Sequence, residues 1–167
     1  KHYVRLVSDK AFERVSQYIH EGKIVYGGQT DSKERFIEPT LLSDVALTSK
    51  VMTEEIFGPI LPMIPFEEQS EVISFIREHE KPLALYYFGK VKDGKEIIRL
   101  TSAGGSCIND VIMHIANENM PFGGVGNSGM GRYHGKLSFD AFSHERAIVT
   151  TTTLIDLPFR YMPYRMF

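Results

Sequence analysis

Short apolar runs alternate along this chain with amphipathic stretches of about ten residues. The clearest run is Leu83–Phe88, whose length and aromatic content are typical of a strand buried on both faces, as in a parallel sheet. Residues 67–79 before it carry apolar side chains at helical spacing, and residues 95–102 after it form another amphipathic stretch. This alternation predicts an α/β fold with a mostly parallel sheet that is flanked by helices.

Further elements continue this pattern on both sides. We expect helices over residues 9–20 and 136–142, and strands or extended segments over residues 23–26, 36–42, 60–66, 106–109 and 147–153. Ser8 precedes the first of these helices and can cap its N-terminus with a side-chain oxygen. The strand expected at residues 147–153 follows a complete series of alternating elements. We therefore expect it to leave the sheet and to pair with another sheet edge.

The composition is that of one globular domain without a nucleic-acid surface. The 167 residues are 43% apolar and 24% charged, and 19 basic against 21 acidic residues give a net charge of −2, whereas nucleic-acid-binding domains normally carry a basic excess. The single cysteine excludes an internal disulfide, which fits a reducing compartment. No apolar run reaches the length of a membrane span. The chain begins with Lys1 and not with Met, which suggests a fragment or a processed product.

Six glycines fall within the fifteen residues Pro121–Gly135. Such a density of glycine predicts a tightly folded loop, because glycine adopts positive φ values and lets other groups approach the backbone closely. Residues 124–129 match the pattern G-x-G-x-x-G of dinucleotide-binding loops, but the residues before them do not read as a strand. We therefore favour a structural loop that packs beside a site over a pyrophosphate-binding loop.

The segment Glu54–Pro59 is a second compact signal. The carboxylate of Glu55 can accept hydrogen bonds from two neighbouring hydroxyl groups, such as those of a ribose. In an extended segment Phe57 would point to the same side and could cover a flat ring next to that ribose. The alternative is a solvated pair of acidic residues followed by a core phenylalanine.

Cys107 is the only thiol, and it falls in the short apolar run expected to form a strand. A buried structural cysteine is the favoured interpretation, because a nucleophilic cysteine needs a base or a helix N-terminus beside it. His114 and His134 are candidate acid–base groups or ligands, although histidines satisfied by the core or a loop are commoner. No spacing of His, Cys, Asp and Glu matches a metal-binding motif.

Taken together, these motifs resemble the aldehyde dehydrogenase superfamily. Glu54–Pro59 is similar to its E-E-I-F-G-P motif, and Pro121–Gly131 is similar to its P-F-G-G-x-x-x-S-G-x-G motif. Glu38–Leu42 resembles its E-P-T-L-L stretch, and the continuation through Arg132–Lys136 and Phe142–His144 resembles the class 3 branch. The resemblance covers essentially the whole chain.

The resemblance implies roles for particular residues. In the family, the residue at Glu55 binds the ribose hydroxyls of the nicotinamide nucleotide and the residue at Phe57 packs against the nicotinamide ring. The chain is therefore expected to contact NAD or NADP through these two side chains. The resemblance places Ile112, Ile115, Phe122 and His134 in the aldehyde pocket, and Asn109, Gly123 and Gly124 in its structural support.

The resemblance places no catalytic residue in this chain. The nucleophilic Cys and the general-base Glu of the family lie upstream of the matched segment. Cys107 is not a substitute, since Gly105 stands where the motif of the nucleophile has Gln. Residues 1–145 then correspond to the C-terminal part of the catalytic domain, and residues 146–167 correspond to an oligomerisation strand and a C-terminal tail.

The implied activity of the full-length protein is the NAD(P)-dependent oxidation of an aldehyde to a carboxylic acid, and we expect the isolated chain to be inactive. The resemblance also implies contacts with the rest of the same enzyme and a homodimer formed through the C-terminal strand. The tail contains Arg160 and Arg165 and does not resemble a hydrophobic anchor, so we expect a cytoplasmic protein. Two alternatives are a non-catalytic fragment or assembly domain derived from such an enzyme, and a thiol enzyme that depends on Cys107.

Overall fold

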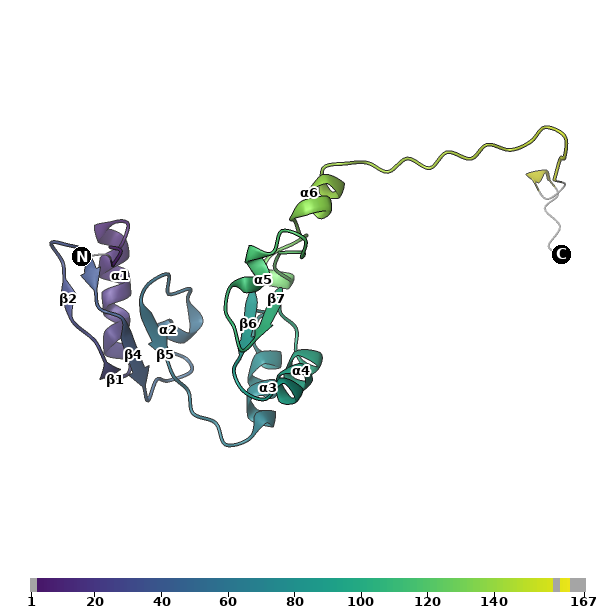
Figure 1. Cartoon of the computed structure of the whole chain (residues 1–167). Helices are drawn as coiled ribbons and strands as arrows, with labels where there is room; N and C mark the ends of the chain where they lie inside the picture. Colours follow the sequence, from purple (N-terminus) through teal and green to yellow (C-terminus); the bar gives the residue numbers. More distant parts are fainter. Residues whose placement is uncertain (1–2, 158–159, 163–167) are drawn as a thin grey trace. The chain divides into compact units, whose positions relative to one another are not determined.

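The computed structural model describes residues 3–157 and 160–162, and the chain divides into two compact units, Lys1–Val72 and Ile73–Phe167 (Figure 1). The first unit contains α1 (Asp9–Tyr18), a 3-10 turn (Ile19–Glu21), β1 (Lys23–Tyr26), β2 (Thr30–Asp31), β3 (Phe36–Ile37), β4 (Thr40–Ser43), α2 (Lys50–Thr53) and β5 (Ile60–Pro62). Helix α3 (Gln69–Glu78) crosses the division. The second unit continues with β6 (Ala84–Tyr87), α4 (Val91–Leu100), β7 (Gly105–Ile108), α5 (Met113–Ala116), a 3-10 turn (Gly126–Ser128) and α6 (Gly135–Ala141).

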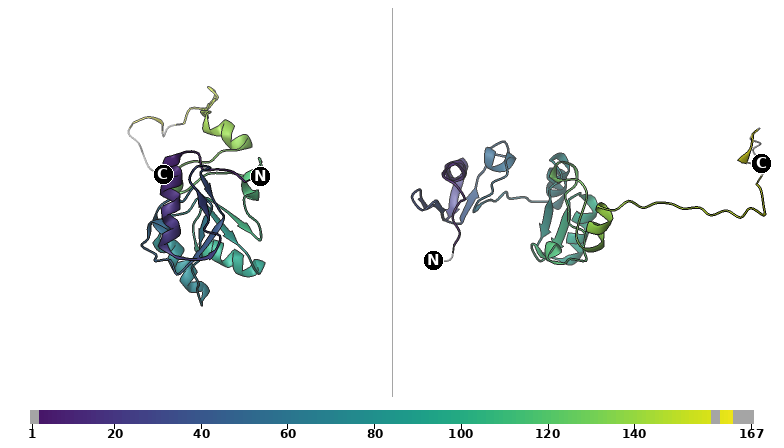
Figure 2. Two further views of the ribbon diagram at one scale, coloured as in Figure 1. Left: turned by 90° about the vertical axis from the view of Figure 1, so that its left-hand side faces the viewer. Right: turned by 90° about the horizontal axis from the view of Figure 1, so that it is seen from above.

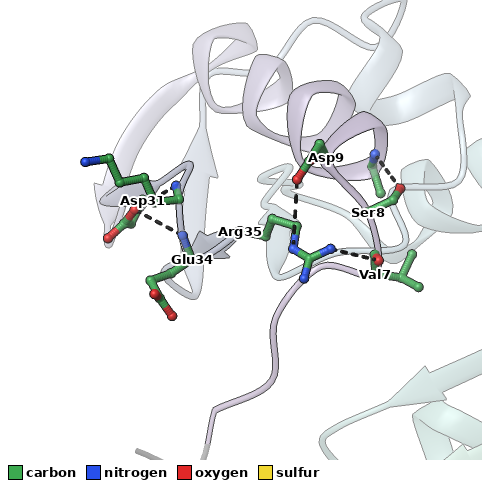
Figure 3. Close-up of polar contacts among 8 residues, drawn as sticks. Val7, Ser8, Asp9, Asp31, Glu34 and Arg35 are labelled. Atoms are coloured by element: carbon green, nitrogen blue, oxygen red, sulfur yellow. Dashed lines mark hydrogen bonds and ion pairs between the residues drawn. The ribbon is translucent and has the colours of Figure 1, made fainter.

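The core of the first unit joins α1 to the strands beside it. Phe12, Val15 and Tyr18 follow one another at helical spacing, and all three are buried, which confirms the face expected from the sequence. They cluster with Ile19, Ile37, Leu42, Val45, Val51 and Ile60. Ser8 caps α1 as expected, because its Oγ accepts a hydrogen bond from the backbone N–H three residues later (Figure 3).

A small hairpin of β2 and β3 is tied to the beginning of α1. Asp31 closes the turn, since its Oδ1 accepts hydrogen bonds from the backbone N–H groups two and three residues later (Figure 3). Arg35 then donates a hydrogen bond of 3.3 Å to the carbonyl oxygen of Val7, and its Nε lies 3.9 Å from Oδ1 of Asp9. The exposed ion pair contributes little by itself, so the backbone contact is the firmer link.

Replacing Leu42 by alanine is expected to lower the free energy of unfolding by about 2–5 kcal/mol, because the substitution leaves a cavity in the core of the first unit. The Leu42 side chain lies on β4 and is fully buried. Urea unfolding of the chain, followed by circular dichroism, measures the change. Leu61→Ala on the neighbouring strand β5 is the matched control, since Leu61 is 58% exposed, and equal losses in the two variants would contradict this account of the core.

The second unit is organised around the parallel strands β6 and β7. Their register pairs Ala84 with Gly105 at one end and Tyr87 with Ile108 at the other. Helix α4 connects the two strands, as a parallel pair requires. It lies close to β6, because a Cβ placed on Gly94 would come within 2.6 Å of the ring of Tyr87.

The α/β character of the chain agrees with the sequence, but the mostly parallel sheet that the sequence predicts is not what the described residues form. They form three small sheets, in which β4 pairs with β5 and β6 with β7 in parallel, while β1–β4 and β2–β3 are antiparallel. The connections explain the difference. Parallel neighbours are joined here through α2 or α4, whereas the short turn between β2 and β3 permits only an antiparallel hairpin.

Residues 147–153 are exposed and carry no strand in the part of the chain that the structure describes (Figure 2). A strand is assigned by its hydrogen bonds to a neighbour, and this segment has none within the described chain. Pairing with another chain therefore stays a prediction, as does the division at residues 145/146. Arg165 and other parts of the tail lie outside the described residues. In the described part of the chain, no helix has the length and apolar character needed to cross a bilayer.

Candidate functional site

The Glu54–Pro59 loop runs from the end of α2 to the beginning of β5, and the side chains of Glu54, Glu55 and Phe57 are exposed to solvent. Glu55 is exposed, and Phe57 is 80% exposed, although a phenylalanine of this size would ordinarily be buried. The alternative of a core phenylalanine is therefore wrong. The segment is not extended throughout, because Phe57 has a φ of +46°, in the left-handed region that aromatic residues rarely adopt.

The backbone of this loop is bound to α1. Arg14 donates hydrogen bonds of 3.0 Å from its two Nη atoms, one to the carbonyl oxygen of Glu55 and one to that of Ile56. The hydroxyl of Tyr18, one turn along α1, donates a hydrogen bond of 2.7 Å to Oε2 of Glu54. Burial, followed by this hydrogen bond to Glu54, raises the pKa of Tyr18, so the phenol keeps its proton and remains a donor. The two acidic neighbours thus differ. The carboxylate of Glu54 accepts a hydrogen bond from Tyr18, whereas that of Glu55 has no hydrogen-bond partner among the described residues.

The glycine-rich segment forms the tightly folded loop that the sequence predicts. Phe122 and Tyr133 face each other across it and exchange backbone hydrogen bonds of 3.0 and 2.9 Å. Gly124 packs against the backbone of Ser128, whose Oγ accepts a hydrogen bond from the N–H of Val125. A three-residue 3-10 turn follows in place of the longer helix that a pyrophosphate-binding loop needs. An open hollow of about 390 Å³ lies beside this loop and is lined by eight residues that include Gly104, Gly123 and Gly124.

An aromatic cluster lies at the base of the same loop. The rings of Phe122 and His134 stack at 5.8 Å, and Tyr133 contacts both of them edge-on. His134 has a φ of +94°, and its buried Nδ1 has no hydrogen-bond partner among the described residues. The structure thus brings together two of the residues that the sequence assigns to an aldehyde pocket.

Ile112 and Ile115, the other two residues of the expected pocket, lie at α5. Ile112 precedes the helix with a φ of +67° and is exposed, whereas Ile115 is half-buried within it. The assignment of Ile112 and Ile115 to an aldehyde pocket stays a prediction.

Asn109 connects the ends of the two parallel strands. Its side-chain Oδ1 accepts a hydrogen bond of 2.7 Å from the N–H of Gly89, and its Nδ2 donates one of 2.9 Å to the carbonyl oxygen of the same residue. Its backbone N–H also donates to the carbonyl oxygen of Tyr87 at the end of β6. This bidentate pairing fixes the direction in which the chain leaves β7 and enters the segment that leads to α5.

A cysteine–histidine pair, which the sequence did not indicate, lies between β7 and α5. Sγ of Cys107 is 3.3 Å from Nδ1 of His114. His114 is only 5% exposed, and its Nε2 has no hydrogen-bond partner among the described residues. A Cβ on Gly105 would come within 2.4 Å of the His114 ring, so the glycine makes room for it. Cys107 is half-buried on the strand. His114 is a base beside the thiol, so the structural interpretation and the thiol-enzyme alternative both stay predictions.

Metal ligation has no support in the described residues, where no group of three His, Cys, Asp or Glu side chains is placed to hold an ion. Each unit thus carries one candidate surface. One is the exposed pair Glu55 and Phe57, and the other is the aromatic cluster with the glycine-rich loop. The first offers a carboxylate acceptor and a free ring face, and the second offers an apolar wall.

Known proteins resemble this chain over most of its length. The profile of the aldehyde dehydrogenase family matches residues 5–148. Aldehyde dehydrogenase family 3 member A2 of Rattus norvegicus is 52% identical over 145 residues, which cover 86% of this chain and 30% of that protein. Other members of family 3 match as well, which confirms the class 3 resemblance.

Solved structures agree with the sequence comparison. The substrate-bound state of Staphylococcus aureus AldH has a TM-score of 0.88 and 45% identity, and the match covers 97% of this chain and 36% of that one. The NAD+ complex of aldehyde dehydrogenase from Bacillus cereus has a TM-score of 0.76 and 32% identity, over 86% of this chain and 30% of that one. The chain spans about a third of the length of the curated relatives it matches. With most of its residues inside the family profile, this chain belongs to the aldehyde dehydrogenase family.

Proposed function

We propose that this chain is the C-terminal segment of an NAD(P)-dependent aldehyde dehydrogenase that oxidises an aldehyde to a carboxylic acid. A thiolate supplied by the rest of the enzyme would add to the aldehyde, NAD or NADP would take up the hydride that the adduct loses, and water would then release the acid and regenerate the thiolate. The segment contributes positioning. Positioning of reacting groups lowers a barrier by as much as roughly 7–11 kcal/mol, so it is a substantial share of the catalysis.

Glu55 and Phe57 are proposed to hold the nicotinamide end of NAD or NADP. The observation that carries the proposal is that both side chains are exposed on one loop whose backbone is fixed by hydrogen bonds from Arg14. A carboxylate can accept hydrogen bonds from both ribose hydroxyls, and a free phenylalanine face can cover the nicotinamide ring. The NAD+ complex among the structural relatives supports a dinucleotide as the cofactor.

The aromatic cluster is proposed to form one wall of the aldehyde pocket. Phe122 and His134 provide a stacked apolar surface, and Ile112 and Ile115 extend the wall from α5. Gly123 and Gly124 shape the loop behind Phe122, and Asn109 fixes the chain entering α5.

The remainder of the active site is proposed to come from other parts of a longer polypeptide, including the nucleophilic Cys and the general-base Glu. The lengths of the relatives support this proposal, because this chain matches only about a third of each of them. The exposed apolar side chains also support it, because a surface of this kind is normally covered by a partner. Those most exposed include Met130, Phe142, Val149 and Leu154.

We further propose a cytoplasmic homodimer in which residues 147–153 add to a sheet edge of the partner. The segment carries β-branched residues and is exposed, as an unpaired strand would be. The alternative is a non-catalytic fragment or assembly domain derived from the same enzyme. That alternative keeps the fold and the pairing segment but assigns no cofactor contact to Glu55.

The isolated chain is expected to show no turnover with NAD or NADP and an aldehyde, whereas the full-length enzyme is expected to be active. The test combines intact-mass measurement of a sample of 19.0 kDa with an absorbance assay for reduced nicotinamide. Full-length Cys107→Ser is the control and should keep its activity, because Cys107 is assigned no chemical role. Turnover by the isolated chain, or its loss in Cys107→Ser, would contradict the proposed division of the active site and favour a thiol enzyme.

A further inference from the structure

One guanidinium group forms hydrogen bonds with the backbone of the loop that carries the exposed side chains of Glu55 and Phe57. Arg14 reaches from α1 to two successive carbonyl oxygens, those of Glu55 and Ile56, at 3.0 Å each. A planar guanidinium that donates through both Nη atoms fixes direction as well as distance. The peptide units on either side of Ile56 are thereby fixed, and these units set the path from Glu55 to Phe57.

Arg14 is itself held in place by a buried neighbour. Its Nη1 also lies 2.7 Å from the Tyr18 hydroxyl, and that hydroxyl donates to Oε2 of Glu54. Tyr18 is 1% exposed, and the guanidinium lies 5.5 Å from the centre of its ring. The negative charge of the Glu54 carboxylate balances the positive charge of the Arg14 guanidinium, so this network at the edge of the core carries no net charge.

The loop has an unfavourable conformation that something must maintain. Phe57 has a φ of +46°, which costs a non-glycine residue energy and persists only where surrounding contacts enforce it. The next residue is pressed onto α1, since a Cβ at Gly58 would come within 2.6 Å of the Val15 side chain. Contacts with α1 thus enclose Phe57 on both sides of its backbone while its ring stays exposed.

We propose that Arg14 is a positioning residue for hydride transfer, acting by fixing Glu55 and Phe57 against the nicotinamide end of the cofactor. This inference rests on the proposed function of the Glu54–Pro59 loop. Arg14 does not touch the reacting atoms. It keeps the Glu55 carboxylate and the Phe57 ring in one relative orientation before the cofactor arrives, so that less ordering remains when the cofactor binds.

The test is Arg14→Met in the full-length enzyme, which keeps an unbranched side chain and removes the guanidinium. The single-turnover rate of hydride transfer is expected to fall about tenfold to hundredfold, with the KM for aldehyde changed less than about twofold. The backbone at residues 56–58, followed by NMR order parameters without cofactor, is expected to become more mobile. Millimolar guanidinium should restore part of the rate of Arg14→Met. The rate of Arg14→Lys should lie between those of the unmodified enzyme and Arg14→Met, because an ammonium does not reproduce the paired donation.

Arg99→Met is the control. It also removes a guanidinium from a helix, but this one is paired with Glu96 on α4 in the other unit, so the hydride-transfer rate should not change. If Arg14→Met does not fold, Arg14→Lys carries the same comparison. An unchanged rate and unchanged order parameters at residues 56–58 in a folded Arg14 variant would overturn the inference.

Combining Arg14→Met with Glu55→Gln separates this inference from the function on which it depends. If Arg14 acts through the loop, the double variant should lose less rate than the two single losses multiplied together. A strong effect of Glu55→Gln with none of Arg14→Met would reject the positioning role alone. No effect of Glu55→Gln would reject the cofactor contact itself, and a full multiplicative loss would show that Arg14 acts independently of Glu55.

Discussion

Glu55→Gln in the full-length enzyme is expected to slow hydride transfer by roughly 10- to 100-fold, the range that corresponds to losing a hydrogen bond to a charged group. Glutamine keeps the size of the side chain but replaces one acceptor oxygen with a donor, so it no longer accepts from two ribose hydroxyls. Because Glu55 is proposed to contact the cofactor and not the aldehyde, the KM for aldehyde should change much less. Single-turnover formation of reduced nicotinamide measures the hydride step directly.

Glu34→Gln is a suitable control for this experiment. It makes the same chemical change at an exposed glutamate of the β2–β3 turn, within the same unit but outside the Glu54–Pro59 loop. Its hydride-transfer rate should equal that of the unmodified enzyme. If Glu55→Gln also leaves the single-turnover rate unchanged, the carboxylate does not hold the nicotinamide ribose, and the loop has another role.

Elements with strong local signals were predictable from the sequence. Helix α1 has a capping serine and a regular apolar face, and both signals appear in the structure. Helix α4 begins at Val91, four residues before the start expected from the sequence, because Gly94 lies inside it. Glycine normally weakens a helix, but here its missing side chain lets α4 approach Tyr87. The packing against β6 overrides the local preference.

Elements defined by partners were harder to predict. Helices α2 and α5 have four residues each, too few to show a period. The expected strand at residues 147–153 has the right composition, but composition does not supply a neighbour with which to pair. The mixed direction of the strands in the small sheets was likewise not predicted. Strand direction depends on the length of each connection, and the strand sequences do not contain that information.

The same distinction applies to the candidate site. The exposure of Glu55 and Phe57 was open to prediction, since their motif is contiguous and resembles a known family. The contribution of Arg14 was not, because its acceptors lie 41 and 42 residues away and an arginine on a helix looks like an ordinary surface residue. The Cys107–His114 pair was missed for a related reason. The seven-residue spacing has meaning only once β7 and α5 are placed side by side.

Gly124→Ala is expected to have the largest effect on the stability of the glycine-rich loop. A Cβ at this position would lie 2.1 Å from the carbonyl oxygen and 2.2 Å from the carbonyl carbon of Ser128, which are backbone atoms that cannot rotate away. Insertion of atoms into a closely packed region typically costs about 1–3 kcal/mol, and occasionally more. We expect a loss at the upper end of this range, and a widened contact between Phe122 and Tyr133 as the loop opens.

Gly131→Ala provides the comparison that isolates this clash, because it adds the same methyl group to the same loop. Gly131 has a φ of +75° but no heavy atom within 4 Å of the added Cβ, so the substitution incurs conformational strain of only about 1 kcal/mol. Urea unfolding of both variants measures the difference, and amide exchange at Phe122 and Tyr133 reports whether their paired backbones separate. If Gly131→Ala is as destabilising as Gly124→Ala, conformational strain and not close approach explains why the loop requires glycine. In that case the packing of Gly124 on Ser128 would no longer account for the shape of the wall behind Phe122.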